Sequence, residues 1–302
     1  MKYKNITVAG SGVLGYQIAF QIAFYGFNVS IYDINDEILE KAKSKFKIIA
    51  KAFKTDLNAT KEQLDVTFKN LTYTSNLAES VKDADLMIEA IPENIAIKIS
   101  FYKNLAKVAP QKTIFATNSS TLLPSQLADS TGRPKQFLAL HFANNIWKHN
   151  TAEIMGHPTT DPKVFKDLIM FAKAIGMLPL PLYKEQPGYI LNSLLVPFLG
   201  ASLDLLVNEV SDPHTIDKTW MKATGAPIGP FAILDTVGIN TVYNINVSSA
   251  EETQEPLALK TVKYLKENFI DKNKLGVSTG EGFYKYPNPS FLDSDFLKIK
   301  PE

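Results

Sequence analysis

The chain has 302 residues, enough for about two domains, and its 45% hydrophobic and 21% charged content is that of an ordinary soluble globular protein. A formal net charge of +1 provides no overall field that would draw it to nucleic acid or to a membrane, so we expect neither partner. The absence of cysteine excludes disulfides, thiolate metal ligands and a cysteine nucleophile.

The N-terminal part alternates strand-like and helix-like segments. Such alternation predicts a parallel sheet with helices on both faces, a Rossmann-like doubly wound α/β domain. We expect strands at 5–10, 28–33, 85–91, 113–118 and 136–142, and helices at 15–26, 35–53 and 59–71. Asn35 is a plausible N-cap of the second helix, with Asp36 and Glu37 in its first turn. Because a strand pattern already begins at Asn5, we expect no signal peptide, and together with the missing cysteines this favours a cytoplasmic protein.

The pattern changes to helices alone after about residue 184. Four segments have helical spacing, at 185–210, 212–224, 230–250 and 256–270. We therefore predict an α/β domain over 1–184 and an all-α domain over 185–302, with Pro187–Gly188 as hinge and helix start. The long apolar stretch 189–207 is interrupted by Asn192, Pro197 and Asp204, so we interpret it as a helix buried in protein and not in a bilayer.

A glycine-rich loop joins the first strand to the first helix. "VAGSGVLG" places Gly10, Gly12 and Gly15 in the G-x-G-x-x-G spacing that permits a tight turn, close approach of a pyrophosphate and close helix–strand packing. Asp33 ends the second strand, where a carboxylate binds the adenosine ribose of NAD and repels the extra phosphate of NADP. The pattern predicts NAD as cofactor; the alternative is a βαβ unit without a ligand.

Polar residues follow three of the predicted strands. Glu93 and Lys98 follow the third, Asn118 and Ser120 the fourth, and Asn144 the fifth. In an open parallel sheet, ligands bind beyond the carboxyl ends of the strands, so these residues are candidates for the ligand site. For any single one of them, an ordinary polar loop is an equally good account.

His141 and Glu153 form the candidate catalytic pair. If 137–142 and 151–155 are adjacent strands, the loop between them brings the imidazole against the carboxylate. A carboxylate that accepts one imidazole N–H fixes the tautomer and leaves the other nitrogen to exchange a proton with substrate. The alternative is a core histidine satisfied by a buried acid. The remaining histidines have no metal-ligand spacing, and we expect no metal.

These motifs together resemble the 3-hydroxyacyl-CoA dehydrogenases, including the short 3-hydroxybutyryl-CoA forms. "GSGVLG", "IEAIPEN", "ATNSSTL", "LHF", "PGYILNSLLVPFL", "GAPIGPFAILDTVG" and "TGEGFYKY" appear in the order and spacing of that family, nearly end to end. The resemblance implies reversible, NAD-dependent oxidation of a 3-hydroxyacyl-CoA to a 3-ketoacyl-CoA. It also implies a place in fatty acid metabolism and a homodimer formed through the C-terminal domain.

The resemblance also implies a role for each candidate. His141 corresponds to the catalytic base and Glu153 to its partner. Ser120 and Asn192 correspond to the groups that hydrogen-bond the reacting oxygen. The remaining matches line the NAD pocket in the family: Glu93, Lys98, Asn118 and Asn144.

The sequence departs from the family in ways that bear on the substrate. Asn145 stands where proline is usual beside the base, Ser193 replaces an arginine, and Ser278 replaces a basic residue. A helical arm over about 36–70 helps to bind CoA in the family and is rich in lysine here, which favours CoA, although a solvated basic face is an equal account. Two alternatives stay open: a dehydrogenase of a CoA-free 3-hydroxy acid, of gulonate or carnitine type, and a non-catalytic NAD-binding protein.

Overall fold

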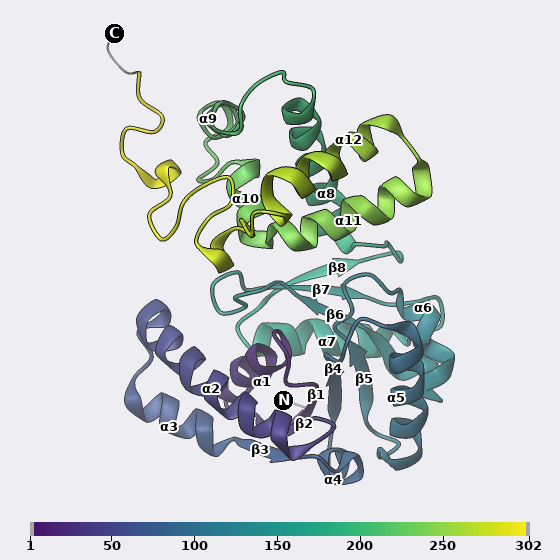
Figure 1. The fold of residues 1–302 in the computed structure, drawn as a ribbon. Coiled ribbons are helices and arrows are strands. Elements are labelled where there is room, and N and C mark those ends of the chain that lie inside the picture. The colour runs from purple at the N-terminus through teal and green to yellow at the C-terminus, as the bar shows by residue number, and fades with distance from the viewer. Residues whose placement is uncertain (1–2, 300–302) are drawn as a thin grey trace. The chain divides into compact units, whose positions relative to one another are not determined.

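A computed structural model describes residues 3–299. They divide into two compact units, with the boundary between residues 191 and 192 (Figure 1). The boundary predicted from the sequence lies a few residues earlier, after residue 184. The first unit holds the sheet, and the second is built from helices.

An eight-stranded sheet forms the centre of the first unit, in the order β3-β2-β1-β4-β5-β6-β7-β8. The strands are β1 (Asn5–Ala9), β2 (Asn28–Tyr32), β3 (Leu71–Thr74), β4 (Leu86–Glu89), β5 (Ile114–Thr117), β6 (Phe137–Phe142), β7 (Thr151–Met155) and β8 (Leu178–Leu182). Strands β1 to β6 are parallel, β7 is antiparallel to β6, and β8 is parallel to β7. The predicted doubly wound sheet is confirmed. Strands β3 and β8 were not predicted, and Leu71 begins β3 instead of ending a helix.

Helices cover both faces of this sheet. Successive strand residues point to opposite sides, so the apolar residues of each strand form a core on both faces. In β4, Leu86 and Ile88 pack into one core, and Met87 packs into the other. The first core receives α1 (Gly15–Phe24), α2 (Asp36–Leu57) and α7 (Pro162–Ala174). The second receives α4 (Leu77–Val81), α5 (Ile95–Val108) and α6 (Pro124–Leu127).

The helical arm consists of α2 and α3 (Lys61–Lys69). The Asn35 side chain accepts a hydrogen bond from the Ile38 N–H, which confirms the predicted N-cap. Leu39, Phe46 and Phe53 on α2 are buried in the same core as α1. The arm is therefore packed against the sheet domain by one apolar face, and its lysines lie on the remaining faces.

The second unit contains α9 (Pro213–Thr224), α10 (Pro230–Val237), α11 (Ile239–Thr253) and α12 (Pro256–Leu265). One helix was predicted over 230–250, but Gly238, at φ +93°, separates α10 from α11. Buried Asp217 accepts hydrogen bonds from the Phe231 and Ala232 N–H groups at the start of α10. Buried Asp235 does the same for Phe283 and Tyr284.

Helix α8 (Tyr189–Val207) joins the two units. Leu199 and Leu203 lie in the core of the second unit, but Leu194 is 70% and Val196 48% exposed. The prediction of a helix buried in protein is therefore wrong for one of its faces. By length and composition α8 is also the one helix among residues 3–299 that could cross a membrane, a test that core helices of soluble proteins pass as well.

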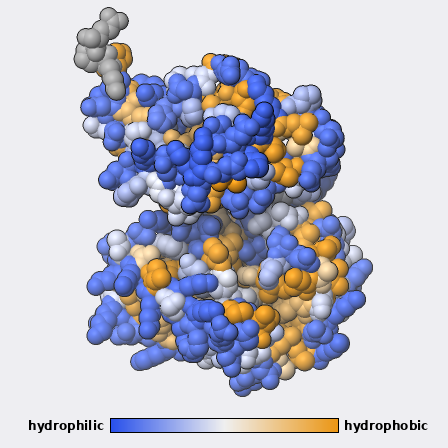
Figure 2. All heavy atoms as spheres, viewed as in Figure 1, coloured by the Kyte–Doolittle hydropathy of each residue, from blue (hydrophilic) through white to orange (hydrophobic). Residues whose placement is uncertain are grey.

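Hydrophobic residues also reach the surface of the first unit. Figure 2 shows a group of them on the side where Figure 1 labels α5. On α5, Ile95 is 41% and Ile97 48% exposed. Scattered apolar side chains of this kind are ordinary on globular proteins and carry no assignment.

Candidate active site

His141 and Glu153 face each other across two neighbouring strands. In the antiparallel pairing of β6 with β7 they occupy opposite positions, so their side chains lie on the same face of the sheet. The imidazole Nδ1 is 3.0 Å from Glu153 Oε2, and both side chains are buried. The structure thus brings the candidate pair together; their catalytic roles stay predictions.

The second oxygen of Glu153 binds the beginning of α8. Glu153 Oε1 accepts hydrogen bonds from the N–H groups of Ile190, at 2.9 Å, and Leu191, at 3.0 Å. Burial by itself raises the pKa of Glu153, but the hydrogen bonds from His141 and from these N–H groups outweigh it and hold that pKa below its ordinary value. The carboxylate is therefore ionised near neutral pH, and as an acceptor it requires a proton on His141 Nδ1.

Ser120 lies on the other side of the imidazole. Its Oγ is 3.1 Å from His141 Nε2, in the loop that follows β5. With the proton on Nδ1, the Nε2 lone pair accepts from the Ser120 hydroxyl. Nε2 is thus the nitrogen that is able to take a proton, and a hydroxyl group stands beside it.

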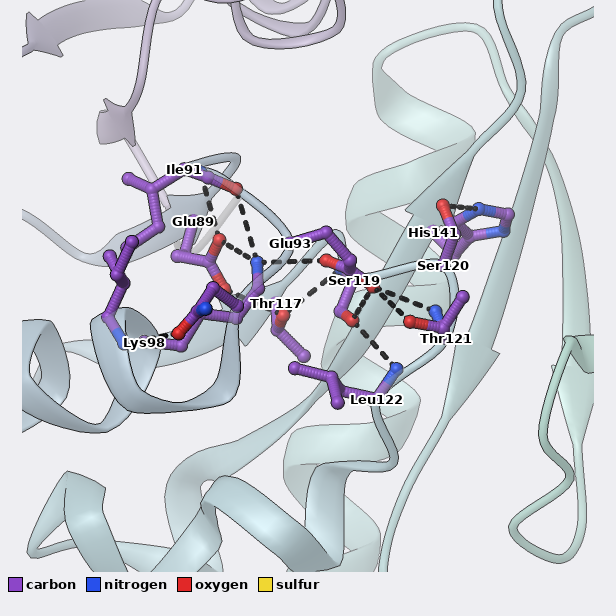
Figure 3. Close-up of polar contacts among 12 residues, drawn as sticks. Glu89, Ile91, Glu93, Lys98, Thr117, Ser119, Ser120, Thr121, Leu122 and His141 are labelled. Carbon is purple, nitrogen blue, oxygen red and sulfur yellow. Dashed lines mark hydrogen bonds and ion pairs between the residues drawn. The ribbon is translucent and has the colours of Figure 1, made fainter. Parts of the chain in front are cut away.

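Glu93 stabilises the turn that contains Ser120 (Figure 3). One oxygen, Oε1, accepts from the Ser119 hydroxyl and from both the N–H and the hydroxyl of Thr121. Burial by itself raises the pKa of Glu93, but the hydrogen bonds from Ser119 and Thr121, with the charge of Lys98, lower it to about 2. Glu93 therefore stabilises the residues on both sides of Ser120, whatever it contributes to cofactor binding.

The Lys98 ammonium group is paired with carboxylates of its own chain. Its side chain is 1% exposed, and its ammonium group pairs with the buried carboxylate of Glu89 and lies 3.3 Å from Glu93. Glu89 also accepts from the Thr117 hydroxyl at 2.8 Å and from the Tyr102 hydroxyl at 3.2 Å. Glu89 was not among the predicted site residues. Its position as an acidic residue within the apolar strand "DLMIEA" could have indicated it. This geometry favours an indirect role for Lys98, through Glu93.

Asn118 binds the backbone of β6, and Asn144 binds the side chain of Gln17 on α1. Asn118 Oδ1 accepts from the Phe142 N–H at 2.9 Å, and Asn144 Oδ1 accepts from Gln17 Nε2 at 3.1 Å. The other atom of that amide, Gln17 Oε1, accepts from the Asn145 N–H at 2.9 Å.

Asn145 explains one departure from the family pattern. Its φ is +57°, a left-handed conformation that asparagine tolerates, whereas proline is fixed near −65°. Proline also lacks the N–H that binds Gln17. The loop beside His141 therefore has a backbone path that a proline at this position excludes.

Tyr189 completes the surroundings of the imidazole and was not among the predicted site residues. Its ring stacks on His141, with centroids 4.4 Å apart and an interplanar angle of 15°. Its hydroxyl donates to the Ser119 carbonyl at 2.7 Å. Its position after Pro187–Gly188 marked only a helix start in the sequence.

The glycine loop fits a dinucleotide. A Cβ on Gly10 would lie 2.5 Å from the Ala90 carbonyl oxygen, and one on Gly15 would lie 1.9 Å from the Gly10 carbonyl oxygen. These two glycines are required by the turn and the helix packing. Nothing lies within 4 Å of a Cβ on Gly12, which leaves space for a diphosphate there. Helix α1 begins at Gly15 without a side-chain cap, so its first N–H groups face that space.

Asp33 lies at the end of β2 beside this loop. Its Oδ2 accepts from the N–H and the hydroxyl of Ser11, and its Oδ1 accepts from the Ile34 N–H. Both lone pairs of Oδ2 are occupied by Ser11, whereas Oδ1 has a second lone pair for a ribose hydroxyl. The residues present thus fit the adenosine end of NAD.

Asn192 is the first residue of the second unit, and its contribution to the reacting oxygen stays a prediction. Among residues 3–299, no group of three or more histidine, aspartate or glutamate side chains could hold a metal ion.

Comparisons with known proteins show which family the chain matches. The family model of the 3-hydroxyacyl-CoA dehydrogenase NAD binding domain matches residues 5–186, and that of the C-terminal domain matches residues 188–286. The human mitochondrial hydroxyacyl-coenzyme A dehydrogenase is 35% identical over 289 residues, covering 94% of this chain and 91% of the relative. A probable 3-hydroxybutyryl-CoA dehydrogenase of Bacillus subtilis is 29% identical over 95% of this chain and 98% of its own.

One solved structure is more similar in sequence than these relatives. It is described as showing substrate-directed dual catalysis of dicarbonyl compounds by diketoreductase. Its identity to this chain is 52% and its TM-score is 0.90, and the match covers 95% of this chain and 100% of that one.

Proposed function

Because the chain belongs to the 3-hydroxyacyl-CoA dehydrogenase family, and is thus an NAD-dependent oxidoreductase, we propose that it interconverts a 3-hydroxyacyl and a 3-ketoacyl group at His141, Glu153 and Ser120. The observation that carries the proposal is the imidazole held between a carboxylate at 3.0 Å and a hydroxyl at 3.1 Å. That arrangement suits proton exchange with a secondary alcohol.

Each side chain has a defined task in the oxidation. His141 Nε2 takes the hydroxyl proton, and an imidazolium forms. Glu153 stabilises this cation by accepting the hydrogen bond from Nδ1. Ser120 hydrogen-bonds the substrate oxygen as its charge changes, and we propose that Asn192 supplies a second such bond. Bound NAD supplies the hydride acceptor. In the reverse direction the same nitrogen returns its proton to the carbonyl oxygen.

A CoA thioester is the first candidate substrate, supported by the family and by relatives named for hydroxyacyl-CoA and 3-hydroxybutyryl-CoA. The lysines of α2 favour CoA only weakly. Lys41 and Lys43 pair with Glu37 and Glu40 on the same helix, so their charges are partly compensated.

A CoA-free dicarbonyl compound is the second candidate. It is supported by the 52% identity to a diketoreductase, and it corresponds to the CoA-free alternative that the sequence left open. A panel of substrates reduced with NADH separates the two: acetoacetyl-CoA, a longer 3-ketoacyl-CoA, acetoacetate and a CoA-free diketo compound. A kcat/KM that is highest for the thioesters supports the first candidate, and one highest for the diketo compound supports the second. If the protein binds NADH but reduces none of these substrates, the result would favour a non-catalytic NAD-binding protein.

The assignment of the base has its own test. His141→Ala should lower kcat by on the order of 10² or more while NADH still binds, because the general base is lost and the glycine loop is untouched. His149→Ala, at an exposed loop position, is the matched control and should keep full activity. Retention of most activity in His141→Ala would reject the assignment.

We further propose a cytoplasmic homodimer that pairs through the second unit. The family resemblance implies the dimer, and exposed leucines on α8 and α12 are available for an interface: Leu194 is 70% exposed, Leu205 42% and Leu259 48%. Sedimentation at several protein concentrations tests the dimer, and a monomer at all of them would reject it.

A further inference from the structure

Tyr189 covers one face of the His141 imidazole. The two rings are nearly parallel, at 15°, with centroids 4.4 Å apart, and Tyr189 is 1% exposed. The imidazole is therefore held at three places: Nδ1 by Glu153, Nε2 by Ser120, and one ring face by Tyr189. The two hydrogen bonds hold the ring nitrogens, and the stacked phenol restrains the tilt of the ring.

The hydroxyl of Tyr189 connects the same ring to the serine turn. It donates to the Ser119 carbonyl oxygen at 2.7 Å, one residue before Ser120. Burial and the nearby carboxylates Glu93 and Glu153 raise the pKa of Tyr189, so the phenol remains a donor throughout any ordinary assay range. One side chain thus contacts the base and fixes the residue next to the hydroxyl that binds the base.

The backbone at Tyr189 is in an unfavourable conformation that serves this placement. Its φ is +57°, in the left-handed region that non-glycine residues seldom adopt. Such a conformation persists only when surrounding contacts stabilise it, and it is found preferentially at functional sites. The next two N–H groups, of Ile190 and Leu191, bind Glu153. The turn at Tyr189 therefore directs its ring to the imidazole and the following backbone to the carboxylate.

We propose that Tyr189 is a positioning residue, which holds the plane of the His141 imidazole and the Ser120 turn in a single arrangement for proton transfer. This inference rests on the proposed function of the same site. The phenol does not contact the reacting atoms; it acts through His141 and Ser119.

Two substitutions separate the stacking on His141 from the hydrogen bond to Ser119. Tyr189→Phe keeps the stacked ring and loses the hydrogen bond to Ser119, so kcat should fall about threefold to tenfold, the effect of one hydrogen bond. Tyr189→Leu loses both contacts, and kcat should fall about tenfold to a hundredfold. KM and the dissociation constant of NADH should stay unchanged, and the midpoint of thermal unfolding of the Phe variant should fall by only a few degrees, because the Ser119 carbonyl loses one donor. Tyr183→Phe, at a side chain that is 90% exposed, is the control for loss of a phenol hydroxyl.

A proton NMR measurement reads the imidazole without any substrate. The Nδ1 proton bound to Glu153 should give a downfield signal that His141→Ala removes. In Tyr189→Leu the signal should broaden, because a mobile ring exposes that proton to exchange with water. The Phe variant should retain it.

The outcomes distinguish the inference from the proposed function. If the wild-type protein reduces none of the substrates, the proposed function fails, and the NMR signal alone judges Tyr189: broadening in the Leu variant supports the inference, and an unchanged signal overturns it. If the wild-type protein is active, an unchanged kcat in Tyr189→Phe overturns the inference. A raised KM with unchanged kcat also overturns it, because Tyr189 would then be a binding contact. If the Leu variant does not fold, the Phe variant decides.

Discussion

Replacement of Glu153 by glutamine tests the arrangement of protons at the site without a change in shape. The carboxylate accepts from three donors: His141 Nδ1 on one oxygen, and the Ile190 and Leu191 N–H groups on the other. A glutamine amide has one oxygen acceptor and one NH₂ donor, so it cannot satisfy all three. Its orientation decides which contact is lost.

The magnitudes favour one orientation. With the amide NH₂ toward α8, two buried N–H groups would lose their acceptor, at a cost of about 1–3 kcal/mol each. With the amide oxygen toward α8, both stay paired and the NH₂ faces His141 Nδ1. The imidazole must then carry its proton on Nε2, toward Ser120, where it is no longer a base. We expect kcat to fall about 10²- to 10⁴-fold, equivalent to about 3–5 kcal/mol of barrier.

The assay is steady-state oxidation and reduction of the best substrate of the panel, with NADH binding followed by fluorescence. Glu153→Gln should bind NADH like the wild-type protein and unfold at a similar temperature, because the contacts with α8 are kept. Glu267→Gln, at an exposed surface pair with Lys263, is the isosteric control and should be fully active. A Glu153→Gln variant that kept more than about a tenth of wild-type kcat would refute the tautomer argument.

Three further changes test other parts of the structure. Asp33→Ala should weaken NADH binding and reduce discrimination against NADPH, since it removes the proposed ribose acceptor and frees Ser11; an unchanged ratio of the two dissociation constants would contradict this. Asn145→Pro should lower the free energy of unfolding by about 2–4 kcal/mol in urea titrations, because proline cannot adopt φ +57°, whereas Asn145→Gly should be close to wild type; equal stability of the Pro variant would contradict the loop geometry. The pKa of Glu93 is lowered from 4.5 to about 2 in the folded protein, so its ionised form contributes stability that is complete above pH about 4.5 and is lost as the pH falls toward 2. Glu93→Gln should therefore lose less stability over that range, and identical pH profiles would reject the assignment.

The amino-acid sequence was sufficient for features that depend on local pattern. The glycines at Gly10, Gly12 and Gly15 follow a strand and open a helix, and Asp33 directly follows the next strand. Asn35 caps α2 because a cap needs only the first turn that follows it. The alternation of strands and helices predicted the sheet, since hydrophobic periodicity is set by neighbouring residues.

Contacts between residues that are distant in the chain were harder to predict from the sequence. Strand β8 has prolines at positions 179 and 181, which weakened its strand pattern, and it forms as a partner of β7. Lys98 looked like a cofactor ligand because it follows a strand end, but burial against Glu89 gives its charge an internal partner. The sequence pattern did not predict the exposed apolar face of α8. Such a pattern shows which residues are apolar, but it does not show which of them pack against another part of the protein.

What the sequence determined by itself was the set of local elements and the residue types available for chemistry. Only the tertiary structure decided that Glu153 is opposite His141, that Glu93 braces the Ser120 turn, and that Tyr189 stacks on the imidazole. These contacts depend on strand register and on a left-handed turn far along the chain, and both are fixed by packing of the whole domain and not by the residues next to them.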